Sequence, residues 1–247
     1  MKNRVVYGAF MIIIMLCCVF LSPVTRVLFF TVAGCLCAYE YSHQMERLNM
    51  HCSMSVMVFY LVLQAVLVLA DAGLSAYCAC FVGSVYLAML SGILRKNVEG
   101  KDALDTVAGL TYPCLLFGVI TETSVSNIWL ETLAIACLST WSCDSGALMG
   151  GVRFGKHKLA PEISPNKTWE GSVIGLLTAG VFGVLVFFLG RWCANVPRLG
   201  GMYTQLPLWL CVLTSLIAST MGQIGDLAES QIKRMIGVKD FSNLIPG

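Results

Sequence analysis

Apolar segments of nearly bilayer-spanning length follow one another along the whole chain. A membrane-spanning helix needs about 20 mostly apolar residues, because the hydrocarbon core of a bilayer is about 30 Å thick. The 247-residue chain is 57% hydrophobic and 12% charged, whereas soluble domains carry about 25% charge. The sequence therefore predicts an all-α, polytopic integral membrane protein with about eight transmembrane helices. The expected segments are Val5–Leu21, Val24–Tyr39, Ser55–Ala70, Ala76–Leu94, Ala103–Ile120, Asn127–Trp141, Gly171–Gly190 and Leu206–Met221.

The lysines and arginines lie mainly on alternate connections between these segments. With a cytoplasmic amino terminus, 13 of the 16 Lys and Arg residues lie on the cytoplasmic side and 3 on the other side. Cytoplasmic loops carry the excess of positive charge. The distribution predicts an even number of spans in a multi-pass protein of the cell inner membrane, with its amino terminus and active site cytoplasmic. The three outer cations are Arg26, Arg191 and Arg198.

The charge balance argues against a nucleic-acid-binding protein, and the positions of the cysteines argue against a zinc site. A formal net charge of +2 does not favour nucleic acid as a partner, because nucleic-acid-binding domains concentrate positive charge on one face. Most of the 12 cysteines lie inside apolar runs, where cysteine behaves as a small hydrophobic residue. Neither CxxC nor HxxxH spacing occurs in the sequence, so a zinc site is not expected.

The first long polar stretch, residues 142–170, combines glycines with cations. Glycine lets the backbone approach an anion closely, and lysines add point charges. The stretch suits phosphate binding, although positive loops of this kind also arise from membrane orientation alone. Ser164–Thr168 reads as a rigid, hydroxyl-rich turn that places Lys167 just before a helix beginning at Glu170, a favourable position for an anion. Asp144, at the start of the stretch, is expected to be either a salt-bridge partner or a metal ligand.

The second polar stretch, residues 222–247, begins as a helix with charged residues on one face. Residues three and four apart are neighbours on a helix, which places Asp226, Glu229 and Lys233 near one face, with Arg234 or Gly237 one turn further on. Glu229 and Lys233 could simply form an ion pair along the helix. Asp226 directly follows the apolar run ending at Met221, and an acid at the membrane boundary is costly unless it has a function.

Taken together, the two stretches supply carboxylates and phosphate-binding cations at the level of the lipid headgroups. This pattern predicts a metal-assisted reaction on a phosphorylated lipid. Mg²⁺ is the expected ion, because it prefers oxygen ligands and takes one or two carboxylates, leaving positions for water and substrate phosphate. Asp226 is the first choice as metal ligand and Asp144 the second.

Several short motifs in these stretches resemble one known family, the phosphatidate cytidylyltransferases or CDP-diacylglycerol synthases. The strong likeness covers roughly the last 110 residues of the chain. The matching segments are Ser230–Arg234, Lys239–Ser242 and Ile245–Gly247, then Asp144–Ala147, Phe154–Pro161, Ser164–Pro165 and Lys167–Gly171, with Ala38–Tyr41 as a weaker match.

The resemblance implies that CTP and phosphatidate in the membrane react, with Mg²⁺ as cofactor, to give CDP-diacylglycerol and pyrophosphate. Residues 1–247 then form a single membrane-embedded cytidylyltransferase domain, with spans in 1–141 and a catalytic half in 142–247. The expected catalytic residues are Asp226, Lys233, Arg234 and Lys167. The expected substrate-binding residues are Asp144, Lys156, Lys158, Ser164, Glu229, Ser230, Lys239 and Asp240. The oligomeric state is left open, a homodimer being one option.

The sequence departs from the family pattern in two places. Leu148 stands where the family usually has an aromatic residue. In the family, the signature continues past Pro246 and Gly247 with His-Gly-Gly and a pair of aspartates that serve the metal, whereas this chain stops at Gly247. We therefore expect weak or absent activity from the 247-residue chain.

Two alternative functions share the same residues. A multi-span transporter for an anionic phosphorylated metabolite also has a basic cytoplasmic mouth, but the repeated halves or broken spans typical of transporters are not evident in this sequence. A CTP-dependent lipid kinase, or a nucleotidyltransferase for another phospholipid, would use the same phosphate-binding groups.

Overall fold

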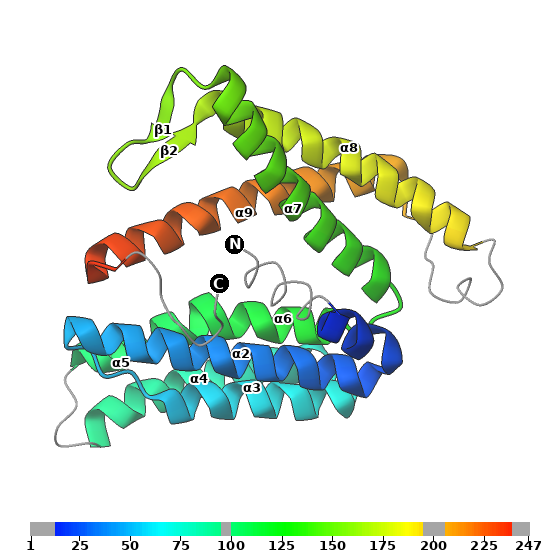
Figure 1. Ribbon diagram of the computed structural model, residues 1–247. Coiled ribbons are helices and arrows are strands. Elements are labelled where there is room, and N and C mark those ends of the chain that lie inside the picture. The colour runs from blue at the N-terminus through cyan, green and yellow to red at the C-terminus, as the bar shows by residue number, and fades with distance from the viewer. Residues whose placement is uncertain (1–12, 95–99, 195–205, 239–247) are drawn as a thin grey trace. The chain divides into compact units, whose positions relative to one another are not determined.

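The computed structural model describes residues 13–94, 100–194 and 206–238, and most of them are helical (Figure 1). Residues 13–21 form a first helical segment. The elements that follow are α2 (Pro23–Met45), η1 (Glu46–Leu48), α3 (Met54–Leu69), α4 (Leu74–Leu94), α5 (Gly100–Gly109), η2 (Leu110–Cys114), α6 (Leu115–Thr123), α7 (Trp129–Phe154), β1 (Lys158–Ala160), β2 (Ser164–Thr168), α8 (Trp169–Ala194) and α9 (Leu208–Ile236).

The expected all-α, polytopic membrane architecture is confirmed. Within the described residues, five helical stretches are long and apolar enough to cross a bilayer, and α3 is a shorter apolar helix. The five stretches are Pro23–Leu48, Leu74–Ile93, Gly100–Thr123, Trp169–Trp192 and Leu208–Ile236. Each expected span from Val24 onward overlaps a helix, whereas part of Val5–Leu21 lies outside the described residues. The number of eight spans stays a prediction.

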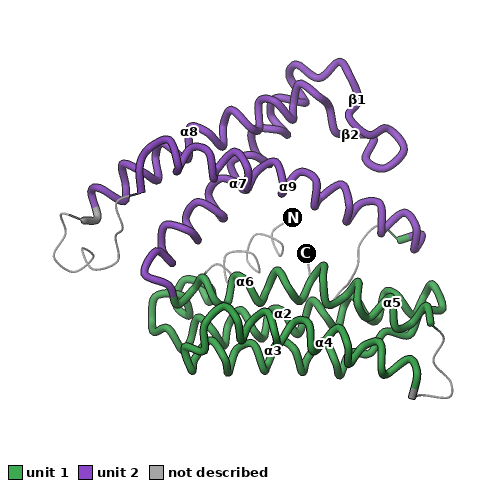
Figure 2. Tube along the Cα trace, turned by 180° about the vertical axis from the view of Figure 1, so that it is seen from behind, with its two compact units in different colours: residues 1–125, 238–247 green, residues 126–237 purple. Residues whose placement is uncertain are grey.

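The chain groups into two compact units, one of residues 1–125 and 238–247 and the other of residues 126–237 (Figure 2). The single domain predicted for residues 1–247, divided at residue 141, stays a prediction. In the first unit, Ala38, Met57, Tyr60 and Leu110 are buried together in a core shared by α2, α3 and the η2 turn.

Buried polar groups join the start of α5 to neighbouring segments of the first unit. The Tyr41 hydroxyl of α2 donates a 2.7 Å hydrogen bond to Asp105 Oδ1. The backbone N–H of His51 donates a 2.8 Å hydrogen bond to Asp102 Oδ1. Because both aspartates are buried, these bonds fix α5 against the end of α2 and the connection to α3.

Helices α7 and α8 of the second unit pack closely because each carries two glycines four residues apart. These are Gly146 and Gly150 on α7, and Gly171 and Gly175 on α8. A Cβ added at Gly150 would lie 2.7 Å from Ile174 Cδ1, and one added at Gly175 would lie 2.7 Å from the Cys143 carbonyl oxygen. Small residues at this spacing let membrane helices approach backbone to backbone.

The polar stretch after residue 142 differs from the expected loop. Helix α7 continues to Phe154, so Asp144 lies within a helix. Ser164–Thr168, expected to be a rigid turn, is strand β2, which pairs antiparallel with β1. The turn prediction is wrong because the β1 backbone supplies hydrogen-bond partners that the local sequence does not reveal. Helix α8 begins at Trp169, where Thr168 Oγ1 accepts a hydrogen bond from Gly171 N at 3.2 Å, the pattern of an N-cap.

Candidate active site

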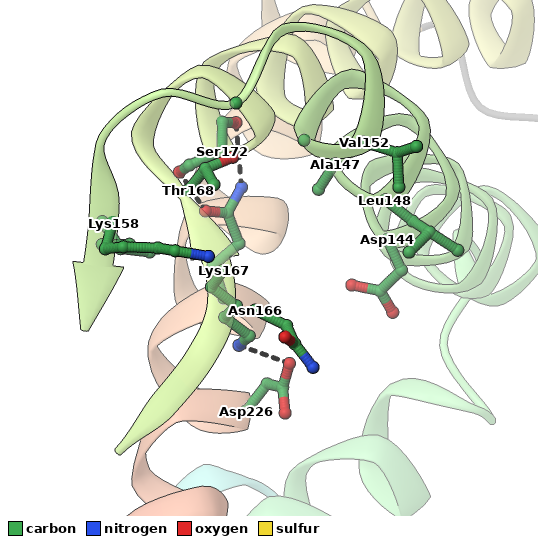
Figure 3. Close-up of a pocket in the computed structure, with 14 residues that line it drawn as sticks. Asp144, Ala147, Leu148, Val152, Lys158, Asn166, Lys167, Thr168, Ser172 and Asp226 are labelled. Atoms are coloured by element: carbon green, nitrogen blue, oxygen red, sulfur yellow. Dashed lines mark hydrogen bonds and ion pairs between the residues drawn. The ribbon is translucent and has the colours of Figure 1, made fainter. Parts of the chain in front are cut away.

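A cavity of about 600 Å³ lies in the second unit, between α7, the β1–β2 hairpin and the facing parts of α8 and α9 (Figure 3). Its α7 wall is mostly apolar, and its other walls carry most of the polar groups. The lining residues are Asp144, Ala147, Leu148, Gly151, Val152, Gly155, Lys158, Leu159, Asn166, Lys167, Thr168, Ser172, Gln223 and Asp226.

An ion pair between the hairpin and α9 crosses one side of this cavity. Lys167 of β2 places its Nζ against the Asp226 carboxylate (Figure 3). The Lys167 side chain is 27% exposed and that of Asp226 is 52% exposed. Both groups therefore remain accessible from the cavity, and Lys167 and Asp226, each predicted as a site residue, lie within contact distance.

A second carboxylate, that of Asp144, points from α7 into the same cavity (Figure 3). Burial raises the pKa of Asp144 above its ordinary value, and the nearby Asp226 carboxylate raises this pKa further, while Lys167 acts in the opposite direction. A nearby cation would favour the ionised form of Asp144, which burial and the Asp226 charge disfavour. The arrangement therefore provides two acidic oxygen donors and adjacent lysines.

Lys158 brings a second lysine to the cavity from β1, opposite the strand that carries Lys167 (Figure 3). The two strands pair in a register that sets Lys158 against Thr168. The hairpin thus presents two cations on neighbouring strands to one cavity, an arrangement that suits an anion with several phosphate groups.

Gln223, which the sequence analysis did not select, ties the three helices together beside Asp226. Its Nε2 donates hydrogen bonds to Cys143 Sγ at 3.1 Å and to the Ser172 carbonyl oxygen at 3.2 Å. Its Oε1 accepts a hydrogen bond from Ser172 Oγ. The available signal was the three-residue spacing from Gln223 to Asp226, which places both on one face of α9.

The remaining sequence-predicted residues of α9 and of the hairpin do not line the cavity. Lys233 Nζ lies 2.7 Å from Glu229 Oε1 in the helical ion pair that was the simpler alternative. Arg234 Nε donates a 3.3 Å hydrogen bond to the carbonyl oxygen of Ile163 in the hairpin turn. The Lys156 side chain is exposed. Ser164 at the start of β2 and Ser230 on α9 do not line the cavity either. Lys239 and Asp240 lie outside the described residues.

The donor atoms of the cavity suit a hard cation. No group of three or more His, Cys, Asp or Glu side chains converges within the described residues, so a site built wholly from protein side chains is not found there. Asp144 and Asp226 nevertheless reach one cavity, and its lining residues include neither His nor Cys. Two carboxylates with space for water and phosphate match the coordination that Mg²⁺ prefers.

The fold defines an integral membrane protein, and its second unit holds a cavity lined by two carboxylates and two lysines. The chain belongs to the cytidylyltransferase family, whose sequence model matches residues 2–247. A phosphatidate cytidylyltransferase of Staphylococcus saprophyticus is 35% identical over 156 residues, which cover 63% of this chain and 55% of that protein. The phosphatidate cytidylyltransferase of Bacillus subtilis is 34% identical over 169 residues, covering 66% of this chain and 57% of that protein. The matches thus span little more than half the length of these relatives.

Proposed function

We propose that the chain acts as a phosphatidate cytidylyltransferase, converting CTP and phosphatidate into CDP-diacylglycerol and pyrophosphate. The observation that carries the proposal is the convergence of Asp144, Lys158, Lys167 and Asp226 on one cavity. The names of the relatives support the choice of substrates. We place the reaction in the second unit, at the cytoplasmic face of the cell inner membrane, where CTP is available.

In the proposed reaction, a phosphate oxygen of phosphatidate attacks the α-phosphorus of CTP. A new P–O bond forms there, the bond to the β-phosphate oxygen breaks, and pyrophosphate leaves. Lys158 and Lys167 bind the triphosphate and hold it in line with the lipid phosphate, since such displacements depend on positioning and charge stabilisation. Asp144 and Asp226 would hold Mg²⁺, which would neutralise the triphosphate charge when bound.

The test uses membranes that contain the 247-residue chain, incubated with phosphatidate, Mg²⁺ and CTP. The CTP is labelled either in the cytidine ring or in the γ-phosphate. Ring label in the lipid product is the expected result. Lipid labelled only from the γ-phosphate would show a kinase instead, and uptake of a phosphorylated solute into vesicles without a lipid product would show a transporter. Binding of labelled CTP is measured alongside turnover.

Asp226→Asn is the decisive variant, because it removes the charge and keeps the size of the side chain. We expect turnover to fall by about two orders of magnitude while membrane insertion is unchanged. The matched control is Asp71→Asn, which alters an exposed carboxylate in the α3–α4 connection. Normal turnover by the Asp226→Asn protein would disprove its role as metal ligand.

A further inference from the structure

The carboxylate of Glu170, in the first turn of α8, joins the end of α7 to the start of the hairpin. Its Oε2 accepts hydrogen bonds from the backbone N–H groups of Lys156 at 3.1 Å and His157 at 3.2 Å. Its Oε1 lies 2.6 Å from Nδ1 of the His157 ring. The Glu170 side chain is 27% exposed. One carboxylate therefore satisfies two backbone donors and an imidazole where the chain leaves α7.

The backbone completes this junction in the opposite direction. The N–H of Trp169, the first residue of α8, donates a 3.0 Å hydrogen bond to the carbonyl oxygen of His157. His157 immediately precedes Lys158, and Lys167 lies three residues before Glu170. The Glu170 contacts and this backbone hydrogen bond thus join the start of the hairpin, next to Lys158, to the first turn of α8, which directly follows β2.

Glu170 is not one of the residues that line the cavity, so any effect on a ligand must pass through the hairpin. Two cations on separate strands bind the same polyphosphate together only if the distance between the strands is fixed. Without the carboxylate, the N–H groups of Lys156 and His157 lose their charged acceptor, and the chain between α7 and β1 gains freedom.

We propose that Glu170 is a positioning residue, whose carboxylate holds the hairpin so that Lys158 and Lys167 engage the triphosphate of one nucleotide. This inference rests on the proposed function and extends it to a residue that does not touch substrate. It predicts that Glu170 controls selectivity for a triphosphate. A nucleoside monophosphate has one phosphate and needs only one of the lysines.

The experiment compares the full chain with its Glu170→Gln variant in detergent, in two measurements. The first is amide hydrogen exchange at residues 156 and 157, which we expect to be faster in the variant. The second is binding of labelled CTP and labelled CMP by equilibrium dialysis. We expect about a tenfold loss of CTP affinity with CMP affinity unchanged. Glu162→Gln, which alters an exposed carboxylate in the hairpin turn, is the control and should change neither measurement.

Two further variants show whether Glu170 acts through the lysines. In a Lys158→Met background, Glu170→Gln should cost much less CTP affinity than in the unmodified chain, since a shared route gives non-additive effects. His157→Ala removes only the ring contact and keeps both backbone hydrogen bonds. It should lower CTP affinity about threefold, and it serves as the test variant if Glu170→Gln does not insert into membranes.

The outcomes separate this inference from the proposed function. If the unmodified chain binds no CTP, the proposed function is overturned, whatever the exchange rates show. If the unmodified chain binds CTP, the inference alone is overturned by unchanged exchange in Glu170→Gln, by equal losses of CTP and CMP affinity, or by additive effects with Lys158→Met.

Discussion

Arg26 shows how a single buried cation stabilises the ends of two helical segments in the first unit. Only 6% of the residue is exposed. Its Nε donates a 2.7 Å hydrogen bond to the carbonyl oxygen of Ser124, and its NH1 donates a 3.1 Å hydrogen bond to that of Val19. These carbonyls lie at the carboxyl ends of α6 and of the segment 13–21, where backbone acceptors lack helical partners. A guanidinium serves both because its donors form a planar fork.

Arg26→Lys should therefore lower the stability of the protein although it keeps the charge. A lysine has one donor centre and leaves at least one of the two carbonyls without its hydrogen bond, at a cost of about 1–3 kcal/mol. The thermal unfolding midpoint of the purified protein in detergent measures this loss. Arg47→Lys, at an exposed position in η1, is the control and should leave the midpoint unchanged. Equal midpoints for the two variants would contradict the capping role of Arg26.

At the scale of single residues, charge and helical spacing predicted part of the candidate site. Asp226 was selected because an acid at the membrane boundary is costly without a function, and Lys167 because it precedes a helix start, a favourable position for an anion. Asp144 was selected as an acid at the start of a basic stretch, and all three residues line one cavity. Lys233 contacts Glu229 along its own helix. The sequence spacing alone was compatible with either this ion pair or a role for Lys233 in the site. Glu170 was missed as a positioning residue because two of its partners are backbone N–H groups, which leave no side-chain pattern in the sequence.

Among the elements, the contact between α7 and α8 depends on Gly175. A Cβ at this position would lie 2.7 Å from the Cys143 carbonyl oxygen and 3.0 Å from Ala147 Cβ, so Gly175→Ala should force the two helices apart. We expect a destabilisation of about 1–3 kcal/mol, measured as a lower thermal midpoint. We also expect a loss of CTP binding, because Asp144 directly follows Cys143 on α7 and would move with it.

Gly180→Ala is the matched control for Gly175→Ala, because both positions lie on α8. A Cβ at Gly180 would meet only Leu216 Cδ2 at 3.6 Å, an ordinary contact. Alanine is also the better helix former by about 1 kcal/mol, so this variant should be neutral or slightly stabilised. A Gly175→Ala protein as stable as the Gly180→Ala protein would show that the close approach of α7 and α8 is not required.

The sequence indicated the apolar helices more clearly than the polar elements. A long apolar run predicts a helix in any lipid environment, because the backbone must satisfy its own hydrogen bonds there. Residues 142–154 contain three glycines and no long apolar run, which favoured a loop. They form the end of α7 because the glycines allow close packing on α8, and such tertiary packing outweighs a low helix propensity. The hairpin was missed because its strands, of three and five residues, are too short to show the alternating apolar pattern of a strand.

For the whole molecule, the asymmetry of positive charge makes the membrane topology testable. Because the expected spans put 13 of 16 Lys and Arg residues on the cytoplasmic side, we expect the connection between α3 and α4 to face away from the cytoplasm and the hairpin to face the cytoplasm. A short, uncharged epitope is inserted at residue 72 in one protein and at residue 162 in another. In intact spheroplasts, antibody should bind the first epitope only. After permeabilisation it should bind both, which is the control for expression and insertion. Binding to the epitope at residue 162 in intact spheroplasts would place the candidate site on the side away from CTP, and the proposed reaction would then be excluded.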